Sequence, residues 1–170
     1  MKILYSSVAL ILVLGVNLIS WPVAQAEQEK EMEPQASQPA MILTIPSDIT
    51  WADVPPSFPP GAKIAVLEGD PHNPEPYTLR LSLPANYKIP AHWHTMIERV
   101  TVISGTLNAG MGDKLDIAQG KAFPAGSFIF IPAKKNHFAW ADEPTIIQIN
   151  GDGPFDINYI NPADDPRNTK

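Results

Sequence analysis

Short runs of apolar or alternating residues, each closed by proline, glycine, asparagine or aspartate, fill the chain from residue 41 onward. In the run YTLRLSL, at 77–83, tyrosine and leucine alternate with threonine, arginine and serine, a period of two that is typical of a half-buried strand. Strands are also expected at 41–45, 63–67, 97–103, 127–131, 137–141, 145–149 and 155–160. No run after residue 40 shows a helical period of useful length, which favours an all-β sandwich or small barrel.

Proline supports this interpretation, because 19 of the 170 residues are proline. This is about twice the usual share of roughly 5%. The prolines cluster between the expected strands, as in VPPSFPPG and DPHNPEPY. In such places proline can begin a turn without breaking the hydrogen bonds of a sheet.

The first 26 residues are typical of a secretory signal peptide. Lys2 precedes an apolar stretch at 8–19, and Ala24 and Ala26 form an A-x-A pattern that predicts cleavage after Ala26. The alternative is an uncleaved anchor, but the apolar stretch is interrupted and shorter than the roughly 20 residues of a membrane-spanning helix. We therefore expect a secreted or periplasmic protein with no membrane association after cleavage.

Three segments follow the predicted cleavage site. Residues 27–40 are polar and acidic and are expected to be a disordered leader. Residues 41–162 are expected to form one domain, because the remaining length suits a single core. Residues 163–170 are expected to be a polar tail.

Composition excludes several classes of function. The chain has no cysteine, which excludes disulfides and thiolate metal ligands. Its formal net charge is −6 and its basic residues are scattered, so nucleic acid is not an expected partner. It also has no G-x-S-x-G or H-E-x-x-H motif and no glycine-rich phosphate loop.

The chemistry is concentrated in PAHWHTMIERVTVISG, at residues 90–105. His92 and His94 are two residues apart, so on a strand they point to the same face. In the next run Glu98 shares a face with two valines, and burying a carboxylate there is costly unless an ion pairs with it. Two imidazoles and a carboxylate are common ligands of a divalent transition metal. The alternative is that these are ordinary surface residues.

A fourth donor is expected from His137. If the strands on either side of the turn after Pro132 form a hairpin, this histidine is carried to the mouth of the same core. The remaining histidine, His72, lies among turn-forming residues. It is expected to be an exposed loop residue without a role.

The order and spacing of these residues resemble the two motifs of the cupin superfamily, and the chain is most similar to small, single-domain bacterial cupins. The first motif is matched by His92, His94, Glu98 and Gly105, and the second by Gly126, Pro132 and His137. The resemblance spans about residues 60–150. It implies a double-stranded β-helix, the jelly-roll barrel of cupins, in which the three histidines and the glutamate hold manganese, iron, nickel, zinc or copper.

The sequence departs from the cupin pattern at three positions. Asn86 and Lys134 stand where turn glycines are usual, and Ala141 stands where asparagine is common. Asparagine tolerates a left-handed backbone nearly as well as glycine, whereas Lys134 is expected to require a somewhat different turn.

Four further residues are candidates for contacts with a substrate: Tyr77, Arg80, Phe130 and Trp140. A barrel-facing arginine could hold a substrate carboxylate. The opposing expectation is that Arg80 points to solvent and that most of the aromatic residues belong to the core.

Two main functions fit these expectations. The first is an exported metalloenzyme acting on a small oxygenated molecule, of dioxygenase, decarboxylase or isomerase type. The second is a non-catalytic cupin that binds a small ligand or a metal, and a sensor module ranks below both. Cupins often pair through sheet edges, so the resemblance also implies a homodimer, in which pairing would cover exposed strands.

Overall fold

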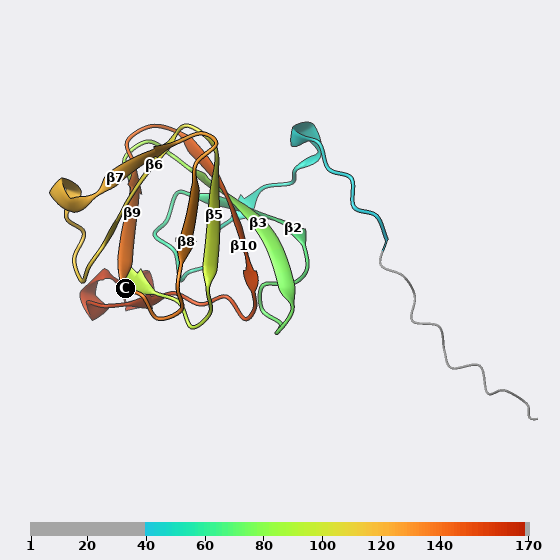
Figure 1. Ribbon diagram of the computed structural model, residues 1–170. Coiled ribbons are helices and arrows are strands. Elements are labelled where there is room, and N and C mark those ends of the chain that lie inside the picture. Colours follow the sequence, from blue (N-terminus) through green and yellow to red (C-terminus); the bar gives the residue numbers. More distant parts are fainter. Residues whose placement is uncertain (1–39, 169–170) are drawn as a thin grey trace, which may run out of the picture. The chain divides into compact units, whose positions relative to one another are not determined.

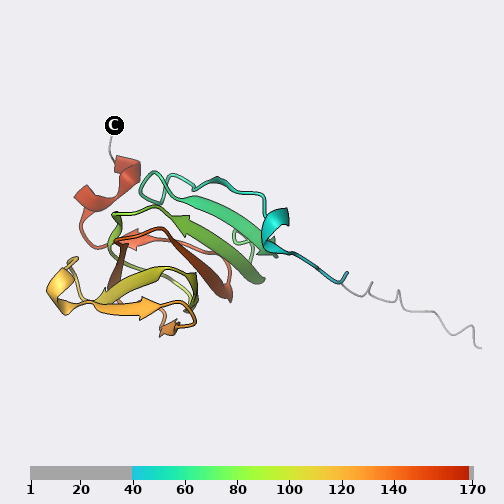
Figure 2. The ribbon, with the colours of Figure 1, turned by 90° about the horizontal axis from the view of Figure 1, so that it is seen from above.

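The computed structural model describes residues 40–168, and these form two antiparallel β-sheets that face each other (Figures 1 and 2). The segments predicted to be a signal peptide and most of the acidic leader lie outside the described residues. Among residues 40–168, no helix is long and apolar enough to cross a bilayer.

One sheet has six strands. In spatial order they are β1 (Ala52–Asp53), β2 (Lys63–Glu68), β3 (Pro76–Leu83), β10 (Thr145–Asp152), β5 (Glu98–Ser104) and β8 (Phe128–Ile131). The other sheet has five strands, in the order β11 (Asn158–Tyr159), β4 (Tyr87–Trp93), β9 (His137–Ala141), β6 (Thr106–Met111) and β7 (Lys121–Pro124). Four short 3-10 helices complete the described chain: η1 (Pro46–Asp48), η2 (Ile117–Gln119), η3 (Pro162–Asp164) and η4 (Pro166–Asn168).

The path of the chain gives this pair of sheets the topology of a jelly roll. From β3 onward the chain crosses from one sheet to the other at nearly every connection, the exception being the hairpin between β6 and β7. The all-β, jelly-roll architecture predicted from the sequence is therefore confirmed.

The core lies between the two sheets. On β3 the buried positions alternate with half-buried ones, as the period of two predicts. Leu81 of β3 pairs with Ile147 of β10, which also pairs with Val102 of β5. All three side chains are buried, and each contributes about 1.5–3 kcal/mol relative to an exposed position.

The sequence-based strand prediction is wrong in three places. Residues 41–45 form no strand, and their large apolar side chains are exposed. Pro46 follows directly and begins η1, and no described strand pairs with this run. The region 106–125, where no strand was predicted, contains β6 and β7, and at 155–160 only Asn158 and Tyr159 are in a strand.

The expectation of a different turn at Lys134 is also wrong. Asn86 and Lys134 both adopt left-handed backbones, with φ of 63° and 59°. Lys134 therefore takes the conformation of the usual glycine directly, and its N–H donates to the carbonyl of His94 at 2.8 Å. This bond joins the turn before β9 to the turn after β4.

The C-terminal residues contact the domain through an arginine. The Arg167 guanidinium donates to the carbonyl of Ile157 at 3.0 Å and pairs with Asp165 at 2.8 Å. Residues 162–168, which include part of the predicted polar tail, thus fold into η3 and η4 next to the end of β11.

Candidate metal centre

A β-bulge on β4 aims His92 into the space between the sheets. Ile89 pairs with Ala139 of β9, and His92 pairs with His137, so two residues of β4 lie opposite the single residue Phe138. The extra residue shifts the alternation by one, as bulges do next to many active sites. Ile89 and His92 therefore both face the cavity although they are three positions apart.

His94 and Glu98 lie on either side of the turn that joins β4 to β5. His94 follows the last residue of β4, and Glu98 is the first residue of β5, where it pairs with Ile131 of β8. The six-stranded sheet thus supplies the carboxylate, while the other sheet and its adjoining turn supply the imidazoles.

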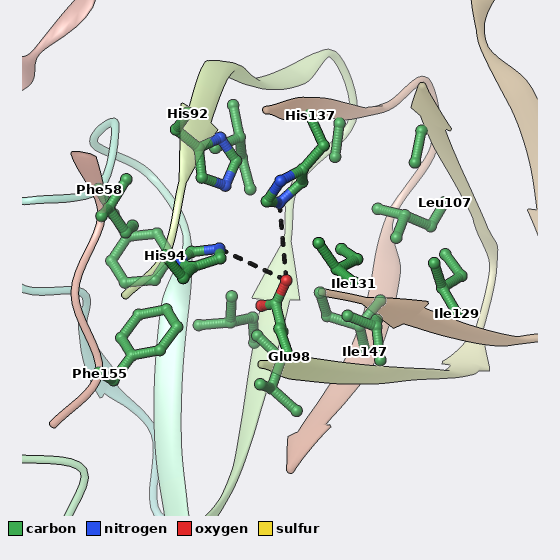
Figure 3. A pocket seen from close by; sticks show the side chains of 17 residues that line it. Phe58, His92, His94, Glu98, Leu107, Ile129, Ile131, His137, Ile147 and Phe155 are labelled. Atoms are coloured by element: carbon green, nitrogen blue, oxygen red, sulfur yellow. Dashed lines mark ion pairs between the residues drawn. The ribbon is translucent and has the colours of Figure 1, made fainter. Parts of the chain in front are cut away.

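The three histidines converge on one point, and Glu98 lies beside it (Figure 3). One ring nitrogen from each of His92, His94 and His137 lies within 4.8 Å of the other two. The Glu98 Oε2 atom is 3.4 Å from His94 Nε2 and 3.7 Å from His137 Nε2. All four side chains are buried.

Each imidazole is oriented by a backbone carbonyl. His92 Nδ1 donates to the carbonyl of Pro90 at 2.7 Å, and His137 Nδ1 donates to that of Lys135 at 2.9 Å. His94 Nδ1 donates to the carbonyl of Asp156. Because a carbonyl only accepts, Nδ1 carries the proton in each ring and the neutral imidazole keeps its lone pair on Nε2. Such partners are usual for metal-binding histidines.

Burial and charge give the three imidazoles different proton affinities. Burial, with the neighbouring imidazoles, lowers the pKa of His92 to about 3, and burial also lowers the pKa of His137. For His94 the effect of burial is outweighed by the Glu98 carboxylate, and its pKa is raised. Burial alone would raise the pKa of Glu98, but His94 and the other imidazoles lower it to about 2.

The donor set fits a divalent cation. His94 Nε2 is buried without a hydrogen-bond partner among the described residues. A buried ring nitrogen left in this way is costly, and a cation at the meeting point of the three imidazoles would satisfy it. Three imidazoles and a carboxylate are ligands that manganese, iron, nickel, zinc and copper all accept, so the set does not select one of them.

These donors line a cavity of about 40 Å³ between the sheets. That volume suits an ion with a few water molecules or a small ligand. Aliphatic side chains such as Ile131, Ile147 and Leu107 form much of its wall, and Phe58 and Phe155 close the side next to His94 (Figure 3).

Comparison with protein families matches residues 16–158 to the family described as "Domain of unknown function (DUF4437)". The chain belongs to this family. No curated protein matches the DUF4437 chain.

Solved structures similar to the DUF4437 chain include a protein named as a cupin. The polyketide cyclase RemF from Streptomyces resistomycificus has a TM-score of 0.62 and 16% identity, over 75% of this chain and 90% of that one. A proposed acetylacetone dioxygenase from Methylibium petroleiphilum has a TM-score of 0.57 and 17% identity, over 78% and 90%. An RmlC-like cupin from Shewanella frigidimarina has a TM-score of 0.52 and 16% identity, over 66% and 91%. The cupin fold implied by the motifs is thereby confirmed.

The four residues suggested as substrate contacts lie away from the cavity of the DUF4437 chain. Arg80 donates to Gln148 of the adjacent strand at 3.1 Å, and Tyr77 packs edge-on against Phe155. Phe130 is half exposed beneath the guanidinium of Arg99, and Trp140 stacks on Phe138 and donates to Asp142 at 3.1 Å. None of the four lines the cavity, so the geometry gives their suggested role no support.

Sequence reasoning missed two residues of the DUF4437 chain that hold His94. Phe155 stacks on the His94 ring with centroids 5.1 Å apart, and the carbonyl of Asp156 accepts its Nδ1–H. The Asp156 carboxylate accepts from the Thr95 N–H at 2.8 Å and from Asn158 Nδ2 at 2.7 Å. Both lie about 60 residues from His94, in a run that the sequence marked only as a strand.

Proposed function

We propose that the protein is an exported metal-dependent enzyme that acts on a small oxygenated molecule, with chemistry of dioxygenase, decarboxylase or isomerase type. The observation that carries the proposal is the meeting of three buried ring nitrogens within 4.8 Å, each imidazole fixed by a carbonyl, in an apolar cavity.

His92, His94, His137 and Glu98 would hold the ion. A divalent ion there supplies Lewis acidity and, if it is iron, manganese, nickel or copper, redox chemistry as well. The carbonyl of Asp156 keeps His94 in the required tautomer, and the carbonyls of Pro90 and Lys135 do so for the other two rings. The apolar wall excludes water, which strengthens the field of every charge inside.

The similar structures favour an enzyme over a binding protein. Two of them are named as a polyketide cyclase and as a proposed acetylacetone dioxygenase, with TM-scores of 0.62 and 0.57. Because these chains are at most 17% identical to this one, their likeness supports the class of site and leaves the reaction open.

Metal reconstitution tests the proposal. Chelator-treated protein is loaded separately with manganese, iron, nickel, zinc and copper, the bound metal is measured by elemental analysis, and loaded samples are screened against organic acids, diketones and phenols. We expect about one ion per chain and loss of that ion in His94→Ala. The matched control is His72→Ala, because His72 is exposed and, within residues 40–168, hydrogen-bonds only to Asp70. Failure of every metal to bind stoichiometrically would contradict the proposal.

The alternative is a non-catalytic cupin that stores a metal or captures a small ligand. The small volume of the cavity is the observation in its favour. Water relaxation measured on manganese-loaded protein separates the two, since an enzyme must keep a coordination position open to exchange. A bound ion without exchangeable water would favour storage.

Export and dimer formation are parts of the proposal with their own tests. Mass spectrometry of protein from the periplasm or the medium should show a chain that begins at Glu27.

The edge strand β8 carries the exposed side chains Phe128 and Phe130, which supports pairing between two copies. Light scattering after size-exclusion chromatography should give a molar mass twice that of the chain. In Phe130→Lys the measured mass should fall toward that of a single chain.

A further inference from the structure

The wall of the metal-site cavity has a uniform chemistry. Apart from the four donors, the residues that line it among 40–168 are all alanine, valine, leucine, isoleucine or phenylalanine. A substrate hydroxyl or carboxylate placed against these side chains would give up its hydrogen bonds to water and gain none from the wall. The wall therefore favours a molecule with an apolar body.

The charge of the site is equally simple. Glu98 is the one acidic side chain among the described residues that line the cavity, and no lysine or arginine lines it. With a divalent ion and three neutral imidazoles, Glu98 leaves a single positive charge uncompensated. A singly charged anion cancels that charge, whereas a dianion leaves a net negative charge in a medium of low dielectric constant.

One flank of the cavity is closed by aromatic rings. Phe58 and Phe155 stack with centroids 5.9 Å apart and an interplanar angle of 14°, and Phe155 also stacks on His94. Both rings separate the cavity from a larger cleft of about 430 Å³, whose lining includes Asp53, Arg167 and other polar side chains.

The opposite flank continues into an apolar vestibule of about 100 Å³ between β6, β7 and β8. It shares Ala109, Ile129, Ile131 and His137 with the cavity. Figure 3 shows Ile129 and Ile131 on the side of the donors away from Phe58 and Phe155. At its mouth stands Met111 of β6, which is half exposed and pairs with His137 across the strands.

We infer that the site takes a small molecule with an apolar body that carries one negative charge in all, such as the enolate of a 1,3-diketone, and that it enters past Met111. This inference rests on the proposed function, because it needs the ion. It excludes sugar acids and dicarboxylates as substrates, since each would bury hydroxyls or a second charge against an aliphatic wall.

A series of three probes of equal length tests the inference. Pentane-2,4-dione, acetoacetate and malonate share a three-carbon spacing of oxygen donors and differ in whether each end carries a methyl group or a carboxylate oxygen. Titration calorimetry on zinc-loaded protein measures binding without redox turnover. We expect pentane-2,4-dione to bind at least roughly tenfold more tightly than malonate, with acetoacetate between them.

The zinc content of the same sample is measured first, so that two failures stay distinct. Protein that takes up no zinc or other metal overturns the proposed function. Zinc-loaded protein that binds malonate as tightly as the diketone, or binds none of the probes, overturns this inference alone.

A charge at the vestibule tests the route of entry. Met111→Lys places a cation at the mouth without disturbing the core, because Met111 is half exposed. It should raise the association rate of malonate relative to that of the diketone by at least about threefold in stopped-flow binding to zinc-loaded protein, since the new charge attracts the dianion. Ile103→Lys is the matched control, because Ile103 is an exposed residue of β5 that does not line the cavity or the vestibule. Equal ratios of association rates in the two variants would contradict the proposed route.

Discussion

Two parts of the site position their imidazoles in different ways. His92 and His137 face each other across β4 and β9, and each donates to a carbonyl two residues earlier in its own strand or turn. His94 lies beyond the end of β4 and is held by Phe155 and Asp156, from the segment between β10 and β11. The sheet therefore builds two thirds of the triad by itself, whereas the last third depends on a distant segment.

The largest loss of metal affinity is expected from a change in the part of the site that the sheet builds. His137→Ala removes a donor from the paired strands and should weaken metal binding by at least about 100-fold. Competition with a chromophoric chelator measures the affinity. Asn136→Ala, the neighbouring change, should leave the affinity close to that of the parent protein. A loss smaller than that caused by changes at Asp156 would reverse the order of importance of the two parts.

A smaller loss of metal affinity is expected from a change in the segment between β10 and β11. Asp156→Ala removes the carboxylate that ties this segment to Thr95, so the carbonyl that orients His94 is held less firmly. We expect metal affinity to fall about tenfold, within the range for partners of metal ligands. The affinity is measured as for His137→Ala.

Two variants sharpen the test of Asp156. Asp156→Asn keeps an acceptor for the Thr95 N–H and should recover part of the affinity. Asp152→Ala removes an exposed carboxylate from the end of β10 and should have no effect. If Asp152→Ala weakens binding as much as Asp156→Ala, the effect is one of overall charge and not of the orientation of His94.

The two parts should also differ in their response to pH when the protein is free of metal. The pKa of His92 is lowered to about 3 and that of His137 is also lowered, so both take up protons at a lower pH than they do in the unfolded chain, where the pKa of histidine is about 6.5. Stability should therefore fall as the pH falls below 6.5 on account of these two groups. His94 acts in the opposite sense, because its raised pKa gives stability that is present below 6.5 and lost as the pH rises through the folded value.

NMR titration of the imidazole signals in chelator-treated protein separates these contributions. The signal of His94 should titrate with a midpoint above that of a free histidine, and the signals of His92 and His137 should titrate with midpoints below it. Three signals that titrate together near the ordinary pKa would show that the two parts do not differ.

The smallest effect is a change in stability, expected at the hydrogen bond between Lys134 and His94, which joins the two parts. Lys134 holds a left-handed backbone, with φ of 59°, while its N–H donates to the carbonyl of His94. Lys134→Gly keeps this donor and relieves the strain, and should stabilise the protein by about 1 kcal/mol with no change in metal affinity. Lys135→Gly, one residue later and without a positive φ, should destabilise it. Urea unfolding measures both, and a destabilised Lys134→Gly would show that the lysine side chain stabilises this turn.

The sequence predicted much of the site because its donors are set by spacing within short segments. The alternation of β3 is visible as Tyr77, Leu79, Leu81 and Leu83, and the His-x-His pair followed by Glu98 carries its own geometry. The structure brings these four donors together as the spacing suggests. That they bind a metal stays a prediction.

Other features depend on contacts that spacing does not encode. Asp156 holds His94 from 62 residues away, and nothing in the sequence around either residue marks the pair. The bulge at Pro90 and Ala91 appears only when β4 is paired with β9. The run 41–45 is apolar enough for a strand but has no described neighbour to pair with, and β6 and β7 are too short and too polar to stand out from a loop.

The bulge also separates two tasks along one strand. Before it, β4 presents Ile89 to the hydrophobic interior, and after it the same face of the strand presents His92. Ile89 could therefore be replaced by another aliphatic residue to change the thermal stability of the protein, while His92 would still point into the cavity. Deleting one residue at the bulge would have the opposite result. His92 would point outward, so the barrel would keep its fold but lose one of its metal ligands.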